Sequence, residues 1–370
     1  MGFERIEGFE VTPAVAEALE ADAITEPTSV QQSAIEPVLA GRHVVIQSGT
    51  GTGKTLAYLL PILQRLRQAP DTRCVIFAPS AELAMQALRV AERYKDPSIA
   101  TGSLVGSGGV TKSTRLIVGT PGRILEMYAA RKLKRVTTIV LDEPDPILAN
   151  EDADFLREVL SRPEPKVQLV IAAATMGPSA EQLVQKVMKP DFVRAQGDNT
   201  PLQTSIAHHF VSVRQSTGKE VCLARFVQDN RCQRAIVFAN QDHAIRHLYR
   251  YLSEHDLRPV SLHSECPRQE RKKAVAAFTE SEARILITND AAARGLDVPN
   301  VEWVLHYDLP HSAPAYVHRA GRTGRAGMSG HSIVFVSEDK RGVLKRYGKE
   351  LGIRFAPFER PGKKQRSGRT

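Results

Sequence analysis

The sequence predicts an α/β protein made of two doubly wound domains, each built on a parallel sheet. First, short β-branched runs that are apolar throughout recur in the first half, among them "HVVIQS", "RCVIFAP", "RLIVGTP", "TTIVLDEP" and "VQLVIAAAT". Second, amphipathic helical segments such as Lys54–Arg67 and His243–His255 lie between runs of this kind. Third, the pattern restarts after Pro201 with "RAIVFAN", "PVSLH", "ARILITN", "EWVLHYD" and "HSIVFVS". Apolar strands joined by helical crossovers are typical of parallel sheets buried on both faces.

The boundary between the two halves follows from composition. The stretch "RAQGDNTPLQT" is polar and carries both Gly and Pro, as a linker does. We therefore predict a first domain over residues 1–196, a linker over 197–206, a second domain over 207–356 and a disordered basic tail over 357–370. In open parallel sheets, ligands bind beyond the carboxyl ends of the strands, so the functional residues are expected there.

Composition places the chain among globular proteins of a reducing compartment. Of its 370 residues, 42% are apolar and 25% charged, and no apolar run approaches the length of a membrane span. The cysteines lie far apart in sequence, which argues against a zinc site or a disulfide framework: Cys74, Cys222, Cys232 and Cys266. We expect a monomer in the cytoplasm or an organelle matrix, neither secreted nor bound to a membrane.

Positive charge is concentrated at the C-terminus. The formal net charge is +9, and the last eleven residues, "RPGKKQRSGRT", contain five cations and no acid. The rest of the chain is therefore only mildly basic, with a net charge of +4. Such a tail can hold a polyanion or can simply keep the terminus solvated.

A glycine-rich loop predicts a phosphate site. The run Val44–Gln47 is a strand, Lys54 opens a helix, and "SGTGTGK" connects them. Glycines allow backbone N–H groups to face phosphate oxygens at the positive end of the helix. Lys54 would reach the β- and γ-phosphates and Thr55 would hold Mg²⁺. The alternative is a chance glycine-rich turn, and Ser48, where the common pattern has glycine, leaves the class of loop open.

A pair of acids at a strand end predicts the hydrolytic centre. In "TTIVLDEPD" the apolar strand runs directly into Asp142 and Glu143. The first carboxylate can bind Mg²⁺ through water and the second can polarise the attacking water. The alternative is a pair of solvated acids in a turn. Pro144 is expected to hold Glu143 in an extended backbone conformation.

Regularly spaced arginines predict further phosphate contacts. In "HRAGRTGRAG" the cations Arg319, Arg322 and Arg325 recur every three residues between small neighbours. Guanidinium groups suit forked contacts with phosphate oxygens. If these arginines and the phosphate loop serve one ATP, the nucleotide binds between the domains. The alternative is ordinary surface charge.

Further motifs complete a family pattern. "PTSVQ", "PSAELA", "TPGR" and "AAT" stand in the first half, and "IVFAN", "RQER" and "NDAAARGLD" in the second. Together with the three motifs above, they make the chain resemble a DEAD-box RNA helicase of superfamily 2 from about Phe9 to Phe355. This resemblance implies two tandem RecA-like domains and accounts for Ser48, because the family needs only a small residue there.

The resemblance assigns roles residue by residue. Gln31 would read the adenine edge, Asp297 would hold the ribose, and Arg322 and Arg325 would be arginine fingers. The catalytic set is Lys54, Asp142, Glu143, Arg322 and Arg325. The implied ATP-binding set is Ile24, Pro27, Gln31, Ser48, Gly49, Thr50, Gly51, Thr52, Gly53, Lys54, Thr55, Asp297, Arg322 and Arg325. Coupling between the domains would fall to Asp145, Thr175 and His318. The implied RNA contacts are Pro79, Ser80, Gly108, Gly109, Thr120, Pro121, Gly122, Arg123, Asn240, Arg271, Asn289 and Asp290.

The function implied is ATP-dependent RNA unwinding or remodelling by closure of two domains. ATP and Mg²⁺ are the implied cofactors. Single-stranded or locally duplex RNA, ribonucleoprotein and a guiding protein are the implied partners. Ala173 stands for the serine of Ser-Ala-Thr, Ala81 for an arginine, and Ile24 for an aromatic residue that stacks on adenine. These departures predict ATP hydrolysis with weak unwinding. The alternatives are an ATP-gated RNA clamp or assembly scaffold and a DNA helicase.

Overall fold

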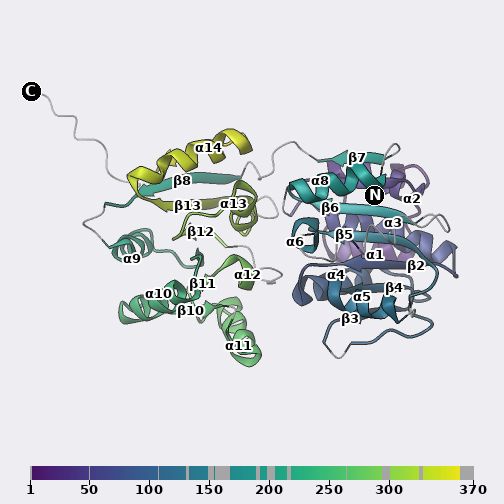
Figure 1. Cartoon of the computed structure of the whole chain (residues 1–370), viewed down its shortest axis with the longest axis horizontal. Coiled ribbons are helices and arrows are strands. Elements are labelled where there is room, and N and C mark those ends of the chain that lie inside the picture. The colour runs from purple at the N-terminus through teal and green to yellow at the C-terminus, as the bar shows by residue number, and fades with distance from the viewer. Residues whose placement is uncertain are drawn as a thin grey trace, which may run out of the picture. The chain divides into compact units, whose positions relative to one another are not determined.

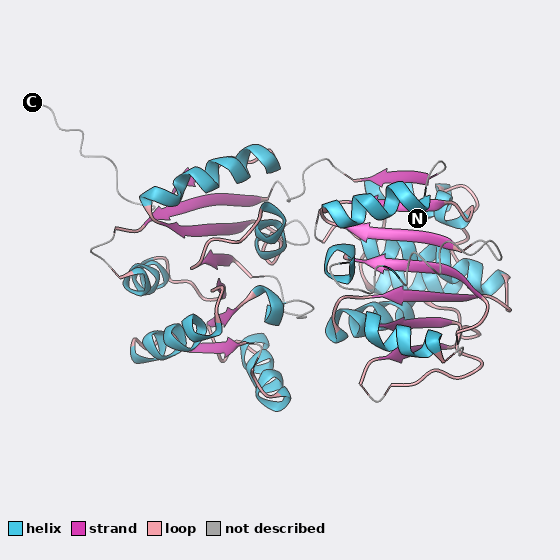
Figure 2. Ribbon diagram, in the orientation of Figure 1, coloured by secondary structure: helices cyan, strands magenta, loops and turns pink. Residues whose placement is uncertain are grey.

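Each half of the chain folds around a seven-stranded parallel sheet with helices on its faces (Figures 1 and 2). The computed structural model describes residues 2–49, 51–106, 108–130, 133–148, 154, 167–188, 192–197, 205–214, 218–263, 265–293, 301–324 and 328–358. The division between the two compact units falls between residues 201 and 202. Most of the predicted linker and nearly all of the predicted tail lie outside the described residues.

The N-terminal sheet has the strand order β3-β4-β2-β5-β6-β1-β7. Its strands are β1 (His43–Gln47), β2 (Arg73–Phe77), β3 (Thr101–Leu104), β4 (Leu116–Gly119), β5 (Val136–Asp142), β6 (Gln168–Ala173) and β7 (Phe192–Gln196). The helices of this unit are α1 (Pro13–Ala21), α2 (Ser29–Leu39), α3 (Lys54–Gln68), α4 (Ala81–Tyr94), α5 (Pro121–Ala129), α6 (Pro144–Leu148) and α8 (Pro178–Leu183), with short helices at Gly2–Arg5 and Val184–Met188.

Alternation along the inner strands divides this unit's core into two layers. Val44 and Ile46 of β1 pack with residues of α1 to α4, whereas Val45 packs with residues of α5, α6 and α8 on the other face. Both sets are fully buried, because successive side chains of a strand point to opposite faces. The fold is therefore doubly wound, as predicted.

The C-terminal sheet has the strand order β10-β11-β9-β12-β13-β8-β14. Its strands are β8 (Ile206–Ser212), β9 (Ala235–Phe238), β10 (Pro259–Leu262), β11 (Ile285–Thr288), β12 (Trp303–His306), β13 (Gly330–Val336) and β14 (Ala356–Pro357). The helices are α9 (Lys219–Asp229), α10 (Asp242–Glu254), α11 (Arg268–Thr279), α12 (Asp290–Ala293), α13 (Ala313–Ala320) and α14 (Arg341–Leu351). Across both units, no helix in the described ranges is long and apolar enough to cross a bilayer.

Candidate nucleotide and RNA site

The phosphate loop lies at the carboxyl end of β1 and leads into α3. Gly51 and Gly53 have φ values of +76° and +92°, a left-handed conformation that glycine adopts without strain. At Gly53 a Cβ atom would also lie 2.4 Å from Nε2 of Gln31. Lys54 folds back across the loop, and its Nζ donates to the carbonyl oxygens of Ser48 and Gly49 at 2.8 Å each. Two carbonyl groups of the loop thus hold the lysine ammonium group beside the loop backbone.

Ser48 is an integral part of this loop. Its Oγ donates to Oγ1 of Thr52 at 2.7 Å, and Thr52 Oγ1 donates in turn to the Gly49 carbonyl at 2.8 Å. Its backbone N–H donates to the Ala173 carbonyl of β6 at 3.2 Å. A glycine at position 48 would keep the backbone bond and lose the hydroxyl bridge. Serine in place of the common glycine therefore adds a hydrogen bond that stabilises the loop.

Two carboxylates face the lysine from the end of β5. Burial, and next the neighbouring Glu143 carboxylate, raise the pKa of Asp142 to about 6. A hydrogen bond from the Tyr58 hydroxyl, 2.9 Å long, and the charge of Lys54 oppose that rise. Burial lowers the pKa of Lys54, and Glu143 and Asp142 act against this. The cluster is a mutually dependent set of one cation and two anions, and all three residues are partly buried.

Tyr58 is a site residue that sequence reasoning missed. It is fully buried on α3, four residues after Lys54, so the two side chains share one face of the helix. The spacing from Lys54 was the signal in the sequence that could have identified it. A buried tyrosine hydroxyl needs a polar partner, and this spacing directs the hydroxyl toward the charged site. Here the partner is Asp142.

The expectation for Glu143 was wrong. Its φ is +55°, in the left-handed region, and not extended as the following proline suggested. Its N–H still donates to the Ala172 carbonyl at 2.8 Å, and α6 begins at the next residue. The chain must pass from a buried strand into a helix within a single residue, and Glu143 takes the strained conformation that this turn requires.

The predicted adenine motif is joined to the phosphate loop. Gln31 is 2% exposed. Its Oε1 accepts from the Thr28 N–H at 2.9 Å, and its Nε2 donates to the Gly53 carbonyl at 3.2 Å. Thr28 Oγ1 donates to the Thr52 carbonyl at 2.9 Å. Pro27 is buried and Ile24 packs on the core of the N-terminal unit. In this structure the oxygen and the nitrogen of the Gln31 side-chain amide therefore both bond to backbone groups, and they hold the Thr28 segment against the phosphate loop.

The predicted coupling residues of the first unit lie at the ends of β5 and β6. Both carboxylate oxygens of Asp145 accept from the Gly177 N–H at 3.1 Å, and a Cβ atom at Gly177 would lie 2.4 Å from Asp145 Oδ1. Among the described residues, the buried Thr175 Oγ1 has no hydrogen-bond partner. His318 lies on α13 of the other unit and is partly buried.

The predicted RNA residues of the N-terminal unit gather at one edge. They follow the carboxyl ends of three neighbouring strands: Pro79 and Ser80 after β2, Gly108 and Gly109 after β3, and Thr120, Pro121, Gly122 and Arg123 after β4. Ser80 caps α4 by accepting from the Leu83 N–H at 3.2 Å. Gly122 and Arg123 are exposed, and Arg123 forms an ion pair with Glu126. This edge presents small residues, an accessible helix start and one cation.

The predicted RNA residues of the C-terminal unit are engaged within the protein. Asn240 accepts from Arg319 at 2.7 Å and donates to the Leu309 carbonyl at 3.1 Å. Asn289 donates to Asp242 at 2.7 Å and accepts from the Ala292 N–H at 2.8 Å. Asp290 accepts from Arg319 with both oxygens, and Arg271 donates to the Ala292 carbonyl at 2.7 Å. Their assignment to RNA stays a prediction.

Arg319 does not make the predicted phosphate contact. It is 1% exposed. Its guanidinium group donates to Asp290 at 2.6 and 2.7 Å, to Asn240 at 2.7 Å and to the Asp308 carbonyl at 2.9 Å. It also lies over the Phe238 ring, 5.1 Å from the centroid. The regular spacing was misleading because α13 turns this side chain inward. Arg322 follows α13 and is partly buried, whereas Thr50, Asp297 and Arg325 lie outside the described residues.

Comparisons with known proteins agree with this architecture. Residues 28–183 match the family model described as DEAD/DEAH box helicase, and residues 218–327 match the helicase conserved C-terminal domain. The chain is 33% identical to the probable ATP-dependent RNA helicase YfmL of Bacillus subtilis over 92% of this chain and 93% of that protein. It is 32% identical to the DEAD-box ATP-dependent RNA helicase CshC of Bacillus cereus, over 95% and 92% of the two chains.

A solved structure shows the same likeness. Dbp5 of S. cerevisiae, bound to RNA and ADP BeF3, superposes with a TM-score of 0.84 at 27% identity, over 96% of this chain and 95% of that one. Two parallel seven-stranded sheets, a phosphate loop, a paired acidic strand end and both family models therefore point the same way. The chain belongs to the DEAD-box family of ATP-dependent RNA helicases.

Proposed function

We propose that this protein is an RNA-stimulated ATPase that unwinds or remodels RNA or ribonucleoprotein locally. The observation that carries the proposal is the cluster of Lys54, Asp142 and Glu143 at the mouth of the phosphate loop. The relatives support it, because they are named ATP-dependent RNA helicases and the solved neighbour holds RNA and a nucleotide. Neither the cluster nor the comparison with relatives depends on the assignment of the RNA-contact residues. That assignment is itself part of the proposal.

The chemistry assigned to each group follows from its position. Lys54 neutralises charge on the β- and γ-phosphates, and the loop N–H groups orient them. Glu143 orients the attacking water and accepts its proton. Arg322 and Arg325 stabilise charge that develops on the γ-phosphate, a contribution of about 10³–10⁵ in rate for such arginines. Closure of the two units on ATP and RNA, with Asp145, Thr175 and His318 coupling them, belongs to the same proposal.

Magnesium fits the donor set. The Thr55 hydroxyl and the Asp142 carboxylate are hard oxygen ligands of the type that Mg²⁺ prefers. Burial and Glu143 raise the pKa of Asp142, so the charged form of this carboxylate gains from a nearby cation. Thr55 and Asp142 would hold the ion, in part through water, and the ion would supply charge neutralisation on the phosphates.

Turnover of ATP with and without RNA tests this proposal. Lys54→Ala should abolish hydrolysis and weaken ATP binding, while Lys186→Ala, an exposed lysine of the same unit, should leave both unchanged. Arg322→Ala should spare ATP binding and lower turnover by orders of magnitude. Wild-type turnover that does not respond to any RNA would refute an RNA-stimulated enzyme.

A second candidate is an ATP-gated RNA clamp or assembly scaffold that binds and holds RNA with little turnover of ATP and weak unwinding. Two observations favour it: position 173 has no hydroxyl, and the Thr175 hydroxyl lacks a hydrogen-bond partner among the described residues. Both lie where hydrolysis would be coupled to movement of the strand. A strand-displacement assay run beside the ATPase assay separates the two functions, since efficient displacement per ATP would exclude the clamp.

A further inference from the structure

A basic hollow opens at the amino edge of the N-terminal sheet, opposite the phosphate loop. Its volume is about 1090 Å³. Lining residues begin or precede four strands: Arg73 begins β2, and Ala100, Arg115 and Arg135 directly precede β3, β4 and β5. In a parallel sheet all amino ends meet at one edge, so this hollow is separated from the carboxyl-edge site by the length of the strands. For the seven residues of β5 that length is about 20 Å.

This hollow is strongly basic. Its described lining contains one acid, Asp71, and five cations: Arg73, Lys112, Arg115, Lys134 and Arg135. The net charge of the lining is therefore +4. The whole chain carries +9, of which +5 lies in residues 360–370. Residues 1–359 thus carry +4, so outside the hollow their charges sum to zero. The hollow is therefore a strongly basic part of the N-terminal unit.

Two of the five cations, Arg73 and Arg115, hold the walls of the hollow together. Arg115 donates to the Leu66 and Ala69 carbonyls at the end of α3, and the bond to Ala69 is 2.7 Å long. Arg73 donates to the Lys112 carbonyl. A helix C-terminus carries a partial negative charge and is stabilised by a nearby cation. The position of Arg115 at the end of α3 is therefore accounted for within the protein, without a bound ligand.

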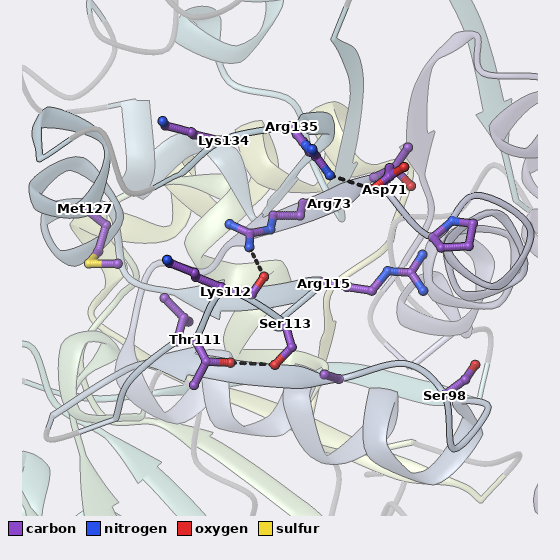
Figure 3. Close-up of a pocket in the computed structure, with 14 residues that line it drawn as sticks. Asp71, Arg73, Ser98, Thr111, Lys112, Ser113, Arg115, Met127, Lys134 and Arg135 are labelled. Atoms are coloured by element: carbon purple, nitrogen blue, oxygen red, sulfur yellow. Dashed lines mark hydrogen bonds and ion pairs between the residues drawn. The ribbon is translucent and has the colours of Figure 1, made fainter.

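Of the other three cations, only Arg135 has a partner for its charged group among the described residues. Arg135 pairs with Asp71, the only acid among the described lining residues. Lys112 and Lys134 are exposed, and their ammonium groups make no hydrogen bond or ion pair among the described residues. In Figure 3 the side chains of Arg73, Lys112 and Lys134 extend from three separate segments toward the side of the hollow where Met127 lies. Two unpaired ammonium groups thus stand beside a guanidinium group in an open basin.

We propose that this hollow binds the phosphate backbone of a second, structured segment of the RNA on which the protein acts. The inference rests on the proposed function, because it takes its ligand from the same substrate. Lysine and arginine contacts to phosphates position an RNA without reading its sequence. Single-stranded RNA is normally held by aromatic stacking as well, and no aromatic side chain is among the described lining residues. A duplex arm, which presents phosphates and no free base faces, fits this surface better.

The position of the hollow adds a length requirement. An RNA strand held at the carboxyl edge reaches this hollow only if it continues for about 20 Å past the sheet. A short oligoribonucleotide therefore occupies the first site alone, and a hairpin with a single-stranded extension can occupy both. The hollow would keep the protein on a structured RNA while the first site exchanges its strand.

Binding of such a hairpin to the full chain, in the absence of ATP, tests the inference. The variant Lys112→Gln/Lys134→Gln should bind the hairpin about tenfold more weakly near 0.1 M salt. It loses two phosphate contacts, so binding releases fewer counterions. The slope of log K against log salt concentration should become shallower by about two. The control Lys186→Gln/Lys349→Gln removes the same charge from two exposed lysines outside the hollow and should change neither quantity.

A short oligoribonucleotide completes the design. Its stimulation of ATP turnover should be equal in wild type and in Lys112→Gln/Lys134→Gln. An unchanged hairpin affinity and salt slope in that variant would overturn the inference even if the enzyme is fully active. Inorganic phosphate or free ATP competing with the hairpin at low concentration would also overturn it, in favour of a small anion. Absence of RNA-stimulated turnover in wild type would instead refute the proposed function, and the binding experiment would still decide on the hollow.

Discussion

Replacement of Arg319 by methionine is the sharpest test of the C-terminal unit. Methionine keeps an unbranched chain of similar length and removes the guanidinium group, which makes four hydrogen bonds to Asp290, Asn240 and the Asp308 carbonyl. These partners end or follow β9, β11 and β12, so the arginine joins α13 to three strand ends. We expect the variant to fold with a much less stable C-terminal unit.

The size of the effect follows from what is left unpaired. Removing one partner of a buried ion pair costs about 3–5 kcal/mol, because the other charge stays without compensation. The Asp290 side chain is 34% exposed, so water can solvate part of the carboxylate, and the lower end of that range applies. We therefore expect a loss of about 3 kcal/mol in the free energy of unfolding. With a urea slope of about 2 kcal/mol/M, the midpoint falls by about 1.5 M.

The chain offers its own probe for this measurement. Trp303 is its only tryptophan, and it is 6% exposed on β12 against the His331 ring. Its fluorescence in a urea titration therefore reports unfolding of the C-terminal unit. Arg341→Met serves as the control, because Arg341 is 40% exposed and its loss should cost less than about 1 kcal/mol.

A loss below about 1 kcal/mol for Arg319→Met would refute the reasoning. It would mean that leaving the partners of the guanidinium group unpaired costs little stability. The double variant Arg319→Met/Asp290→Asn provides a second check. Removing the orphaned charge should recover part of the lost stability, because an uncharged amide is cheaper to leave unpaired than a carboxylate. A double variant less stable than Arg319→Met alone would contradict the account of the pair.

Further predictions concern Tyr58 and the buried histidines. Tyr58→Phe should lower the free energy of unfolding by about 1–2 kcal/mol and weaken Mg-ATP binding, because Asp142 loses a donor; the matched control Tyr94→Phe, which removes a 2.6 Å bond to another aspartate, should lower stability without affecting ATP binding in a thermal-shift titration. Equal effects of the two variants on ATP binding would remove Tyr58 from the site. Burial lowers the pKa of His306 well below 6.5 and that of His208 to about 4. Both stay neutral in the fold while the unfolded chain takes up protons, so stability is full above pH 6.5 and is lost as pH falls toward 4. The urea midpoint reported by Trp303 should therefore be lower at pH 5 than at pH 7.5, and an equal midpoint at the two pH values would contradict this prediction.

The apolar runs predicted ten of the fourteen strands in the described residues. Each of the ten runs became a strand. The four strands without such a run are β3, β7, β8 and β14, and three of these lie at the ends of the sheet orders. A strand near a sheet edge is covered less completely, so polar residues are tolerated there, as the two histidines of β8 show. An apolar run is therefore a weaker signal for strands near an edge, although it did predict β10.

Residues whose role depends on backbone groups were predicted more securely than those that depend on side-chain neighbours. The phosphate loop is local, because its glycines, Lys54 and the start of α3 are consecutive in the chain. The conformation of Glu143 and the inward direction of Arg319 depend on how a strand end meets a helix and how a helix is turned. Tyr58 was missed because its partner Asp142 is 84 positions away.

By itself, the sequence determined the α/β class, the repeat of the pattern in two halves, and the local phosphate and acidic motifs, because periodicity and short motifs are encoded by neighbouring residues. Tertiary structure alone decided that Tyr58 contacts Asp142, that Arg319 is buried where α13 meets three strand ends, and that five cations from three segments line one hollow. Each of these depends on distances between residues far apart in the chain, and only the packing of helices and strands sets such distances.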